Sequence, residues 1–292
     1  MPVVFGETEV PIIRPDPGLY GRVCVLTVGN QRWTDLRVTF KIEKSSSKHT
    51  NNAEIVIYNL SPTSRMGIVQ RGTPVSLVAG YADTAAIIYV GELVEPTHTR
   101  DGSDWTTKLV CRTGDAAWYK YVSRAYAGSV PRVQVLKDLA TSMGFVVPTA
   151  GAALVASYGV LGAGIVTHGH VHEEMDYLLR PLGLEWSIQD GELQIVAMNT
   201  GTREPAVLLN ATSGLIGTPE PQEAYHFTAT RGKPKGIKAK SLLQPSIRPG
   251  RLVKIESESA TGVYVVNTCS HVGDTHGNDW QTEFEARYIG EA

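Results

Sequence analysis

The residues whose types and spacing most suggest chemistry are three histidines at alternate positions, His168, His170 and His172, in the run THGHVH. In an extended strand every second side chain points to the same side, and imidazole is a common metal ligand. A metal site also needs converging ligands from other segments and partners that orient them. The run leads directly into a predicted helix start, which would take His172 out of the row. We therefore expect a polar strand-to-helix turn, and we keep metal binding as the alternative.

Two further groups of ionisable residues fall in predicted hairpins. At one hairpin tip, His271, Asp274 and His276 include a His/Asp pair of the kind that does acid–base work. No nucleophile or pocket signal accompanies them, so we interpret them as turn residues. Paired acids that cleave glycosides need a fixed separation across a cleft, and nothing in the sequence indicates one for the second group. That group, which we interpret as a solvated face, consists of Glu92, Glu95, Asp101 and Asp104.

A basic segment, residues 231–254, contains no Asp or Glu. The favoured interpretation is a solvated strand face. One alternative is guided docking to an acidic partner. Another is the lining of a lumen that DNA crosses, with charge directed at phosphates and no base reading. The cations of this segment are Arg231, Lys233, Lys235, Lys238, Lys240, Arg248, Arg251 and Lys254.

The remaining candidates for a binding surface are aromatic or polar. The tryptophans are scattered on predicted strands or at their ends, and we expect them to pack in cores and at barrel ends, not to stack on bases. The polar stretch Ser45–Asn52 is predicted as a loop, either free at the surface or ordered only on assembly at an entropic cost. No catalytic residue, cofactor or metal ligand is predicted. The tryptophans are Trp33, Trp105, Trp118, Trp186 and Trp280.

The elements that must position these residues are organised around residues 36–60. Apolar and polar side chains alternate over residues 36–43, which predicts a strand with one buried face. Residues 53–60 carry apolar side chains on both alternating faces and predict a more deeply buried strand. An isolated hairpin is only marginally stable, so we expect further strands to complete a first barrel around this pair.

Other local patterns predict the rest of the secondary structure. Prolines make residues 1–21 an extended arm that we expect to lie on a neighbouring surface. The Gly/Ala-rich tract 151–166 is predicted as a buried or mobile loop. Helices are predicted after Ser61-Pro62, from Ser129-Val130-Pro131 to Gly144, and over 172–180. Strands are predicted over 23–28, 75–80, 87–96, 105–112, 118–126, 184–188, 193–195 and at several places within 225–289.

Length, charge and cysteine content limit the class of protein. The 292 residues suggest roughly two domains, and the net charge of -2 argues against a surface built mainly for nucleic acid or an anionic membrane. No signal peptide opens the chain and no tract is suited to span a bilayer, so no membrane anchor is expected. Cys24, Cys111 and Cys269 are far apart and lack CxxC spacing, which favours reduced thiols in a cytosolic chain.

The chain contains an internal repeat. Residues 89–112 can be laid without gaps on residues 264–287, with identical residues at several positions and Asp-Trp-x-Thr shared by both. Upstream, Gly72-x-x-Val75-x-Leu77 matches Gly250-x-x-Val253-x-Ile255. Such self-similarity suggests one structural unit used twice. Three chains would then present six similar barrels, and closed cyclic rings are a common solution for homo-oligomers.

Three runs carry a resemblance to a known family: residues 41–61, KIEKSSSKHTNNAEIVIYNLS; residues 241–250, SLLQPSIRPG; and residues 271–280, HVGDTHGNDW. They resemble phage baseplate central-hub proteins, the hub of contractile tails, which are related to the hub part of type VI secretion spike proteins. The first run is similar to the first barrel of that family, and the other two are similar to its second barrel. The resemblance covers most of the chain and is weakest over 145–170.

This resemblance implies a mainly β protein with an α+β insertion, two related tail-tube-like β-barrel domains, and a pseudo-six-fold ring as a trimer. The expected parts are an arm (1–22), a first β-barrel domain (23–127), a small α+β domain (128–200) and a second β-barrel domain (201–292). The implied role is that of a structural symmetry adapter, not an enzyme. It would join a six-fold tail tube to a three-fold spike and form part of the DNA conduit.

The implied partners are two further copies of the chain, a tail tube or distal tube-ring protein and a spike protein, with tape-measure and wedge proteins as further partners. Sequence-specific nucleic acid is not among them. The implied location is the virion baseplate of a phage or other contractile injection system, after assembly in the host cytoplasm. Two alternatives remain. One is a metal-dependent or cell-wall-degrading tail enzyme that uses His168, His170 and His172, and the other is a monomeric carbohydrate- or peptide-binding β module.

Overall fold

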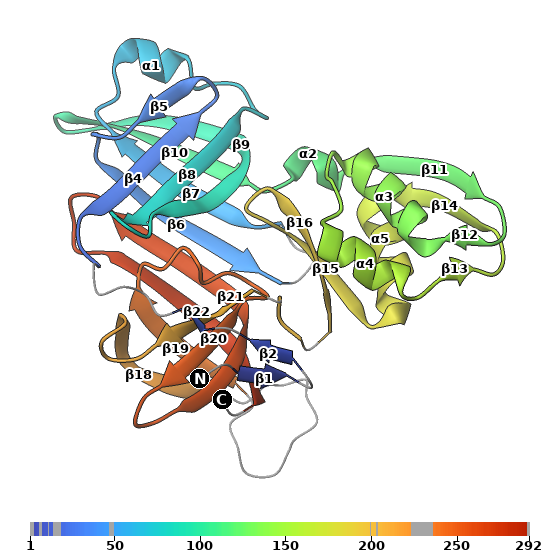
Figure 1. Ribbon diagram of the computed structural model, residues 1–292. Coiled ribbons are helices and arrows are strands. Elements are labelled where there is room, and N and C mark those ends of the chain that lie inside the picture. Colours follow the sequence, from blue (N-terminus) through green and yellow to red (C-terminus); the bar gives the residue numbers. More distant parts are fainter. Residues whose placement is uncertain are drawn as a thin grey trace.

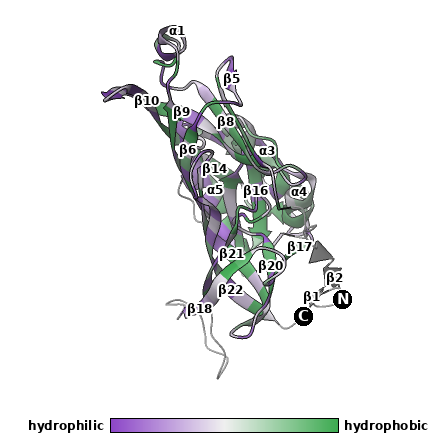
Figure 2. Ribbon diagram, turned by 90° about the vertical axis from the view of Figure 1, so that its left-hand side faces the viewer, coloured by the Kyte–Doolittle hydropathy of each residue, from purple (hydrophilic) through white to green (hydrophobic). Residues whose placement is uncertain are grey.

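The computed structural model describes residues 19–46, 50–198, 200–202, 204–222 and 236–290, and three short strands within residues 3–13. Figure 1 shows two β units, one above the other, with a smaller α+β unit beside them. In the view of Figure 2 the molecule is elongated, and polar and apolar residues both occur along its strands. The fold is mainly β, as the sequence predicts. None of the described helices is long and apolar enough to cross a bilayer.

The first β unit is built on the predicted hairpin of residues 36–60. Its two strands pair in antiparallel register from Val38↔Ile57 to Glu43↔Asn52, with the alternating residues of the first strand buried. In the sheet the strands lie in the order β6-β7-β10-β9-β8-β4-β5. The elements are β4 (Arg22–Val28), β5 (Gln31–Trp33), β6 (Val38–Ser45), β7 (Asn52–Tyr58), α1 (Pro62–Met66), β8 (Pro74–Tyr81), β9 (Ala86–Asp101) and β10 (Asp104–Arg112).

The second β unit follows the same plan. Its strands lie in the order β18-β19-β22-β21-β20-β17, so each strand has the neighbours of its counterpart in the first unit. The outermost pair differs in direction, because β17 runs parallel to β20 whereas β4 runs antiparallel to β8. The elements are β17 (Ala206–Leu209), β18 (Leu215–Gln222), β19 (Gly236–Leu242), β20 (Leu252–Glu256), β21 (Thr261–Asp274) and β22 (Trp280–Gly290). Tyr225, where strands were predicted to begin, lies outside the described residues.

The repeated hairpins correspond with a shift of two residues on their first strands. Both have a register irregularity at the same place on the second strand, next to Val110 in β10 and next to Glu285 in β22. Val75 lies opposite Gly91, whereas its counterpart Val253 lies opposite Tyr264. The cause is the turn, which spans residues 102–103 between Asp101 and Asp104 in the first hairpin and residues 275–278 between the hydrogen-bonded Asp274 and Asp279 in the second. The gapless alignment is therefore correct for the second strand and off by two for the first.

The two β units are joined into a single 14-stranded sheet. β21 pairs antiparallel with β6 from Thr268↔Ser45 to Asp274↔Thr39, and we call this pairing the seam. At the seam a Cβ on Gly273 would lie 2.3 Å from the Phe40 ring, so only glycine fits there. The pairing path of the described strands ends at β18 on one side and at β5 on the other. The predicted barrels are thus open sheets along this path.

The tip of the β21–β22 hairpin is built into the first unit. Trp280 is 2% exposed, belongs to the first unit's core and donates from Nε1 to the Gly80 carbonyl at 3.3 Å. Arg22 donates from Nη1 to the Gly277 carbonyl at 2.6 Å. Arg37 donates from Nη2 to the Asp274 carboxylate at 2.7 Å. The second unit is therefore fixed to the first by side chains as well as by the seam.

The α+β unit contains the predicted helices and hairpin. In α3, Leu136, Leu139 and Met143 are buried as predicted, and Gly144 ends the helix at φ 89°. Two predictions are wrong. The strand expected from Trp118 begins at Tyr121, because residues 115–118 form a helical turn. The tract 151–166 is not a loop, because helix α4, strand β13 and the start of strand β14 occupy most of it. The elements are α2 (Asp115–Trp118), β11 (Tyr121–Tyr126), β12 (Val130–Pro131), α3 (Arg132–Met143), α4 (Thr149–Ala156), β13 (Val160–Leu161), β14 (Ile165–His170), α5 (Val171–Leu179), the 3-10 turn η1 (Arg180–Leu182), β15 (Leu184–Gln189) and β16 (Glu192–Ala197).

The arm lies on the second β unit. β1 (Val3–Phe5) pairs with β2 (Thr8–Val10), and β3 (Ile12–Ile13) adds a parallel strand to the edge of β17. The expected neighbouring surface is therefore a sheet edge of the same chain.

Leu109 and Phe284 occupy equivalent positions in the two hairpins, and both are 1% exposed or less. We expect Leu109→Ala to lower the free energy of unfolding by about 2–5 kcal/mol, because the lost methyl groups leave a cavity in a packed core. Lys108→Ala, at the partly exposed next position, is the matched control and should change it by less than about 1 kcal/mol. Urea denaturation followed by tryptophan fluorescence measures both; equal losses in the two variants would contradict the assigned register.

Candidate functional site: the junction of the three units

A partly buried carboxylate, with 10% of its side chain exposed, lies where the two β units meet the α+β unit. Asp190, at the tip of the β15–β16 hairpin, contacts the ammonium of Lys44 on β6 and lies 3.9 Å from Nη1 of Arg248 in the second β unit. The Lys44 side chain is 1% exposed. Asp190 has φ 53° and is followed by Gly191, so the predicted Asp-Gly turn is confirmed. One turn residue thus connects all three units.

The ion pairs continue from Asp190 into the second β unit. Arg248 donates from Nη2 to Glu204 at 2.6 Å, and Arg251 contacts the other oxygen of the same carboxylate. Arg251 is 6% exposed. Glu204 lies in the segment that leads from the α+β unit to β17, so this carboxylate fixes the connecting chain to the second unit. We call these five residues the ionic junction: Lys44, Asp190, Glu204, Arg248 and Arg251.

Amide side chains form a second set of contacts beside the ionic junction. Asn51 donates from Nδ2 to the Ile188 carbonyl at 2.9 Å and accepts from the Ser45 amide at 3.0 Å. Gln189 donates from Nε2 to the Ser45 carbonyl at 2.8 Å. The ends of the predicted polar loop are therefore held by the α+β unit, whereas residues 47–49 lie outside the described part. These contacts satisfy backbone groups that would otherwise be buried without partners.

His271 is fully buried next to this junction. Its Nδ1 lies 2.9 Å from the Thr282 hydroxyl, and its Nε2 lies 3.8 Å from Sγ of Cys269. Burial and the nearby Lys44 charge hold the pKa of His271 well below its usual value, against an opposing contact with the Ile247 backbone. Burial also raises the pKa of Cys269 to about 12. The pair is therefore a neutral thiol beside a neutral imidazole, which is the opposite of an activated nucleophile.

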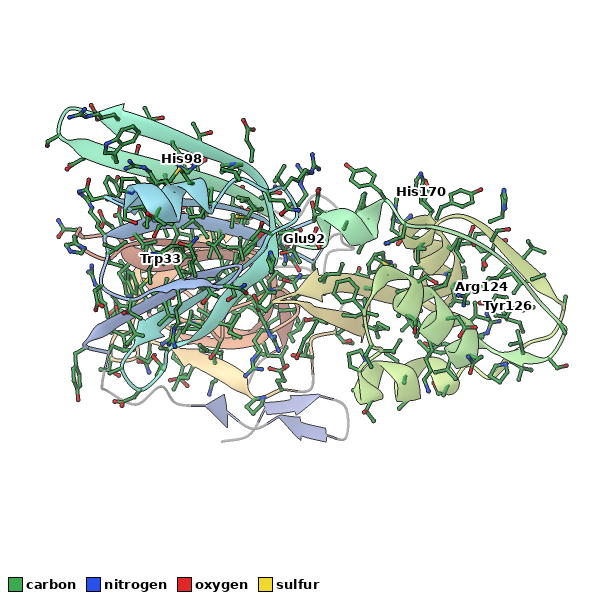
Figure 3. The ribbon with its side chains drawn as sticks, turned by 90° about the horizontal axis from the view of Figure 1, so that it is seen from above. Trp33, Glu92, His98, Arg124, Tyr126 and His170 are labelled. Atoms are coloured by element: carbon green, nitrogen blue, oxygen red, sulfur yellow. The ribbon has the colours of Figure 1, made fainter. Side chains whose placement is uncertain are left out.

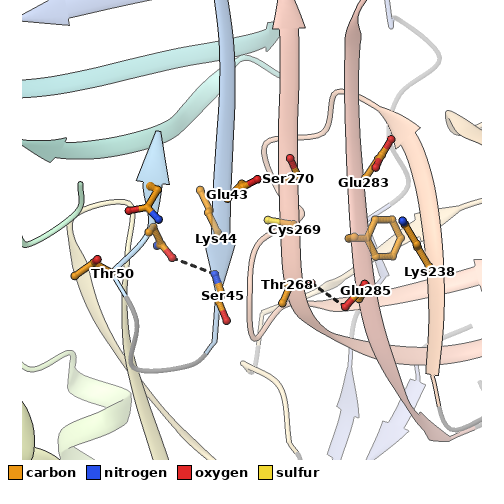
Figure 4. A pocket seen from close by; sticks show the side chains of 13 residues that line it. Glu43, Lys44, Ser45, Thr50, Lys238, Thr268, Cys269, Ser270, Glu283 and Glu285 are labelled. Atoms are coloured by element: carbon orange, nitrogen blue, oxygen red, sulfur yellow. Dashed lines mark hydrogen bonds between the residues drawn. The ribbon is translucent and has the colours of Figure 1, made fainter. Parts of the chain in front are cut away.

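A surface recess of about 410 Å³ opens over the seam (Figure 4). The carboxylates of its lining have partners: Glu43 pairs with Lys41 at 2.5 Å, Glu283 pairs with Lys240 at 3.5 Å, and Glu285 accepts from the Thr268 hydroxyl at 3.4 Å. It is lined by Glu43, Lys44, Ser45, Thr50, Asn51, Asn52, Lys238, Thr268, Cys269, Ser270, Glu283, Phe284 and Glu285.

The three histidines lie on the α+β unit, His168 and His170 on β14 and His172 in α5. Figure 3 shows His170 in this unit, away from the β units. Both ring nitrogens of His168 face hydroxyls, those of Tyr121 at 2.8 Å and of Ser123 at 3.2 Å. His172 is the second residue of α5 and stacks on Trp118 with ring centroids 4.2 Å apart. In the described part of the chain no three His, Cys, Asp or Glu side chains are grouped to hold a metal ion. The geometry favours a stacked polar turn over the metal-dependent alternative.

The two groups of ionisable residues that were predicted in hairpins do not come together into a site. His271 is buried, whereas Asp274 is partly exposed in the ion pair with Arg37 described above, which holds the pKa of that carboxyl below its usual value. His276 is exposed beside Thr275. Among the carboxylates on the first hairpin, Glu92 accepts the Ala116 amide at 2.9 Å where β9 meets α2 (Figure 3). Glu95, Asp101 and Asp104 are exposed, as predicted.

The basic segment divides into three parts. Arg231, Lys233 and Lys235 lie outside the described residues. Lys238 and Lys240 lie on β19, and Lys254 lies on β20, where it pairs with Glu256 at 2.8 Å. For Arg248 and Arg251 the prediction of a solvated face is wrong, because both belong to the ionic junction. The sequence signal that was missed is Lys44, which continues the buried phase of Phe40 and Ile42.

The tryptophans pack against protein. Trp186, 4% exposed, donates from Nε1 to Asp176 at 3.0 Å. Trp105 lies beneath the Arg65 guanidinium at 3.9 Å, and Trp33 packs against the first unit's core. With Trp118 and Trp280 described above, these contacts agree with the predicted packing role.

We expect Asp190→Asn to lower the free energy of unfolding by about 3–5 kcal/mol, because it leaves Lys44 buried without its counter-charge. Asparagine tolerates the left-handed backbone of the turn, so the change isolates the charge. Glu192→Gln, exposed on the same hairpin, is the control and should have little effect. Chemical denaturation measures both; a stability of Asp190→Asn equal to that of the control would contradict the structural role of this carboxylate.

The buried neutral state of His271 predicts a pH dependence. Its folded pKa lies below the value of 6.5 expected in the unfolded chain, so the unfolded chain takes up the proton first as pH falls. Stability should be fully present above about pH 6.5 and decrease below it. His271→Gln should reduce this slope between pH 6.5 and 5, whereas His276→Gln should leave it unchanged. Thermal unfolding across this range is the measurement, and an unaltered slope in His271→Gln would contradict the assignment.

Comparison with solved structures shows a fold common to tail proteins. A tail protein from Neisseria meningitidis MC58 aligns with a TM-score of 0.63 at 13% identity, over 92% of this chain and 97% of that chain. The 43 kDa tail protein of prophage MuSo2 from Shewanella oneidensis aligns with a TM-score of 0.65 at 10% identity, over 92% and 98%. An E. coli component of the type VI secretion system aligns with a TM-score of 0.60 at 10% identity, over 91% and 77%.

Comparison with curated protein sequences finds no match. Among family models, the one described as Baseplate hub gp41 matches residues 23–280, which covers the first β unit, the α+β unit and the second β unit up to the first residue of β22. The resemblance inferred from the three sequence runs is thereby confirmed. The chain is a member of the baseplate hub gp41 family, a structural component of the phage tail.

Proposed function

We propose that three copies of this chain form a ring at the end of the tail tube, and that the ring adapts the six-fold tube to a three-fold spike. The observation that carries the proposal is the repeated strand order of the two β units. A ring of three such chains presents six similar sheets around one axis. Closed cyclic symmetry is a common arrangement for homo-oligomers.

The outer face of the joined sheet supports a role as part of the DNA conduit. Lysines on this face are paired with nearby carboxylates, as in Lys108 with Glu54 at 2.8 Å, and Lys240 and Lys41 with the partners given above. A protein that grips DNA neutralises phosphates with free cations. A face on which these three lysines are already neutralised suits passage more than tight binding.

The proposed action is binding and not catalysis. Burial raises the pKa values of Cys24 and Cys111 to about 12, as it does for Cys269, so no thiol is activated. The proposed partners are the tail tube or distal tube-ring protein and the spike, with tape-measure and wedge proteins around them. Assembly in the host cytoplasm, before incorporation into the virion, completes the proposal.

Two measurements test this function. Light scattering of the purified chain should give three times the mass of one chain, and an electron-microscopy image of the tail with this chain tagged should show density on the axis between tube and spike. A tag located away from the axis would contradict the adapter role. A monomer in both solution and particle would favour the carbohydrate- or peptide-binding module instead.

A further inference from the structure

The last part of β9 has an uncovered edge. β8 and the two residues before it pair with β9 only as far as Leu93. From Glu95 to Asp101 the partner of β9 among the described strands is β10 alone. Every second residue of this stretch turns its backbone N–H and C=O groups away from β10. Unpaired edge groups of this kind are a template for another strand.

The residues that turn their backbone outward are Pro96, His98 and Arg100. Trp105, which lies opposite Arg100, accepts the Asn59 amide with its carbonyl, so its backbone faces away from β9. Opposite residues of an antiparallel pair either both face each other or both face away, so Arg100 faces outward. The proline fits this alternation, because a residue that faces outward has no N–H to give to β10.

The second unit shows what covers the equivalent edge. Nδ1 of His98 lies 3.0 Å from the Thr107 hydroxyl, just as Nδ1 of His271 lies 2.9 Å from the Thr282 hydroxyl. His271 is fully buried and lies opposite Ile42 of β6 at the seam. His98, on the first unit, is only half-buried (Figure 3). The end of β9 is therefore a seam edge that has no partner among the described strands.

The counterpart of β6 in the second unit is β18, which ends the pairing path of the sheet. By the registers of the two sheets, Pro221 takes the place of Ile42. The register irregularity at residues 217–219 takes the place of Phe40. Within one chain β6 lies on β21, so copies arranged head to tail would bring β18 of one chain to β9 of the next.

Prolines interrupt this second pairing. Ile42 and Cys269, whose backbones face each other's strands at the seam, each have an N–H to donate. Their counterparts Pro221 and Pro96 have none. Each proline removes one possible hydrogen bond from the ladder, so a pairing of β9 with β18 is weaker than the seam.

We propose that copies join in the ring by pairing the β9 edge of one chain with the β18 edge of the next, and that this joint is a proline-interrupted form of the seam. The inference rests on the proposed trimer and assigns its interface. Each copy has one edge of each kind, so three head-to-tail contacts close the ring. Three firm joints within chains then alternate with three weaker joints between chains, and the ring opens only at the weaker ones.

Disulfide cross-linking tests which edges meet. Thr99 and Glu220 are exposed and correspond to Val272 and Lys41, which lie opposite each other at the seam. Thr99→Cys and Glu220→Cys are placed in separate chains with different affinity tags, co-expressed and oxidised. We expect a product with both tags on a non-reducing gel, which can only join two copies. Arg32→Cys, exposed on the β5 edge, replaces Thr99→Cys in the matched control and should give no such product.

Light scattering of the same samples before oxidation separates the two ways of failing. Trimers that give the product with both tags support the joint. Trimers that do not give it overturn the joint and leave the proposed ring intact. Monomers that do not give it overturn both. The native cysteines are buried and are common to every sample.

The variant Pro221→Ala tests the interruption, because it restores an N–H without adding a large side chain. The affinity of each joint should rise roughly 2- to 10-fold, as expected for one net hydrogen bond. Sedimentation over a dilution series measures it. Pro131→Ala, at an exposed strand proline of the α+β unit, is the control and should leave the affinity unchanged. An affinity of Pro221→Ala at or below that of the natural chain would overturn the interruption.

Discussion

The structure depends on the pairing of β6 with β21, because this ladder turns two units of one chain into a single sheet. Backbone hydrogen bonds set the relative position of the units, and Gly273 allows the aromatic rings of Phe40 and Trp280 to pack across the pairing. With the hairpin tip clamped by Arg22 and Arg37, the two units cannot rotate freely. A rigid angle between them is what the proposed ring would need if its six sheets are to be nearly equivalent.

The ionic junction serves the same end by a different physical means. Charges removed from water are stable only when each has a partner in good geometry, so the Asp190 tip has few alternative positions once Lys44 is buried. Hydrophobic contact is non-directional, so by itself it would restrict the orientation of the α+β unit less. We therefore interpret the buried charges as specifying how the α+β unit docks, more than as a source of stability.

The sequence predicted what is local and missed what is remote. Alternation over residues 36–43, the Asp190-Gly191 turn and the glycine that ends α3 each reflect a pattern within a few residues, and all three appear in the structure. The tract 151–166 was misread because its Ala and Gly residues show no polar face, although Val155 packs in a core. The seam depends on residues more than two hundred positions apart, and the inward position of Arg251 depends on Glu204, 47 positions away, so the local pattern holds no signal for either. Lys44 in phase with buried neighbours was the one available sign of the junction.

Arg37 and Asp274 are separated by 237 positions, and the seam connects segments equally remote in the chain. On the ribosome, β6 therefore emerges long before its neighbour has been synthesised. Until β21 is synthesised, the β6 edge of the first unit has unpaired backbone donors and acceptors. Such an edge can pair with a wrong strand. Topologies of this kind also fold slowly, since distant segments must meet before they are stabilised. Production of correctly built tails is thus exposed to the rate of translation and to chaperone supply, at a step that precedes any encounter between subunits.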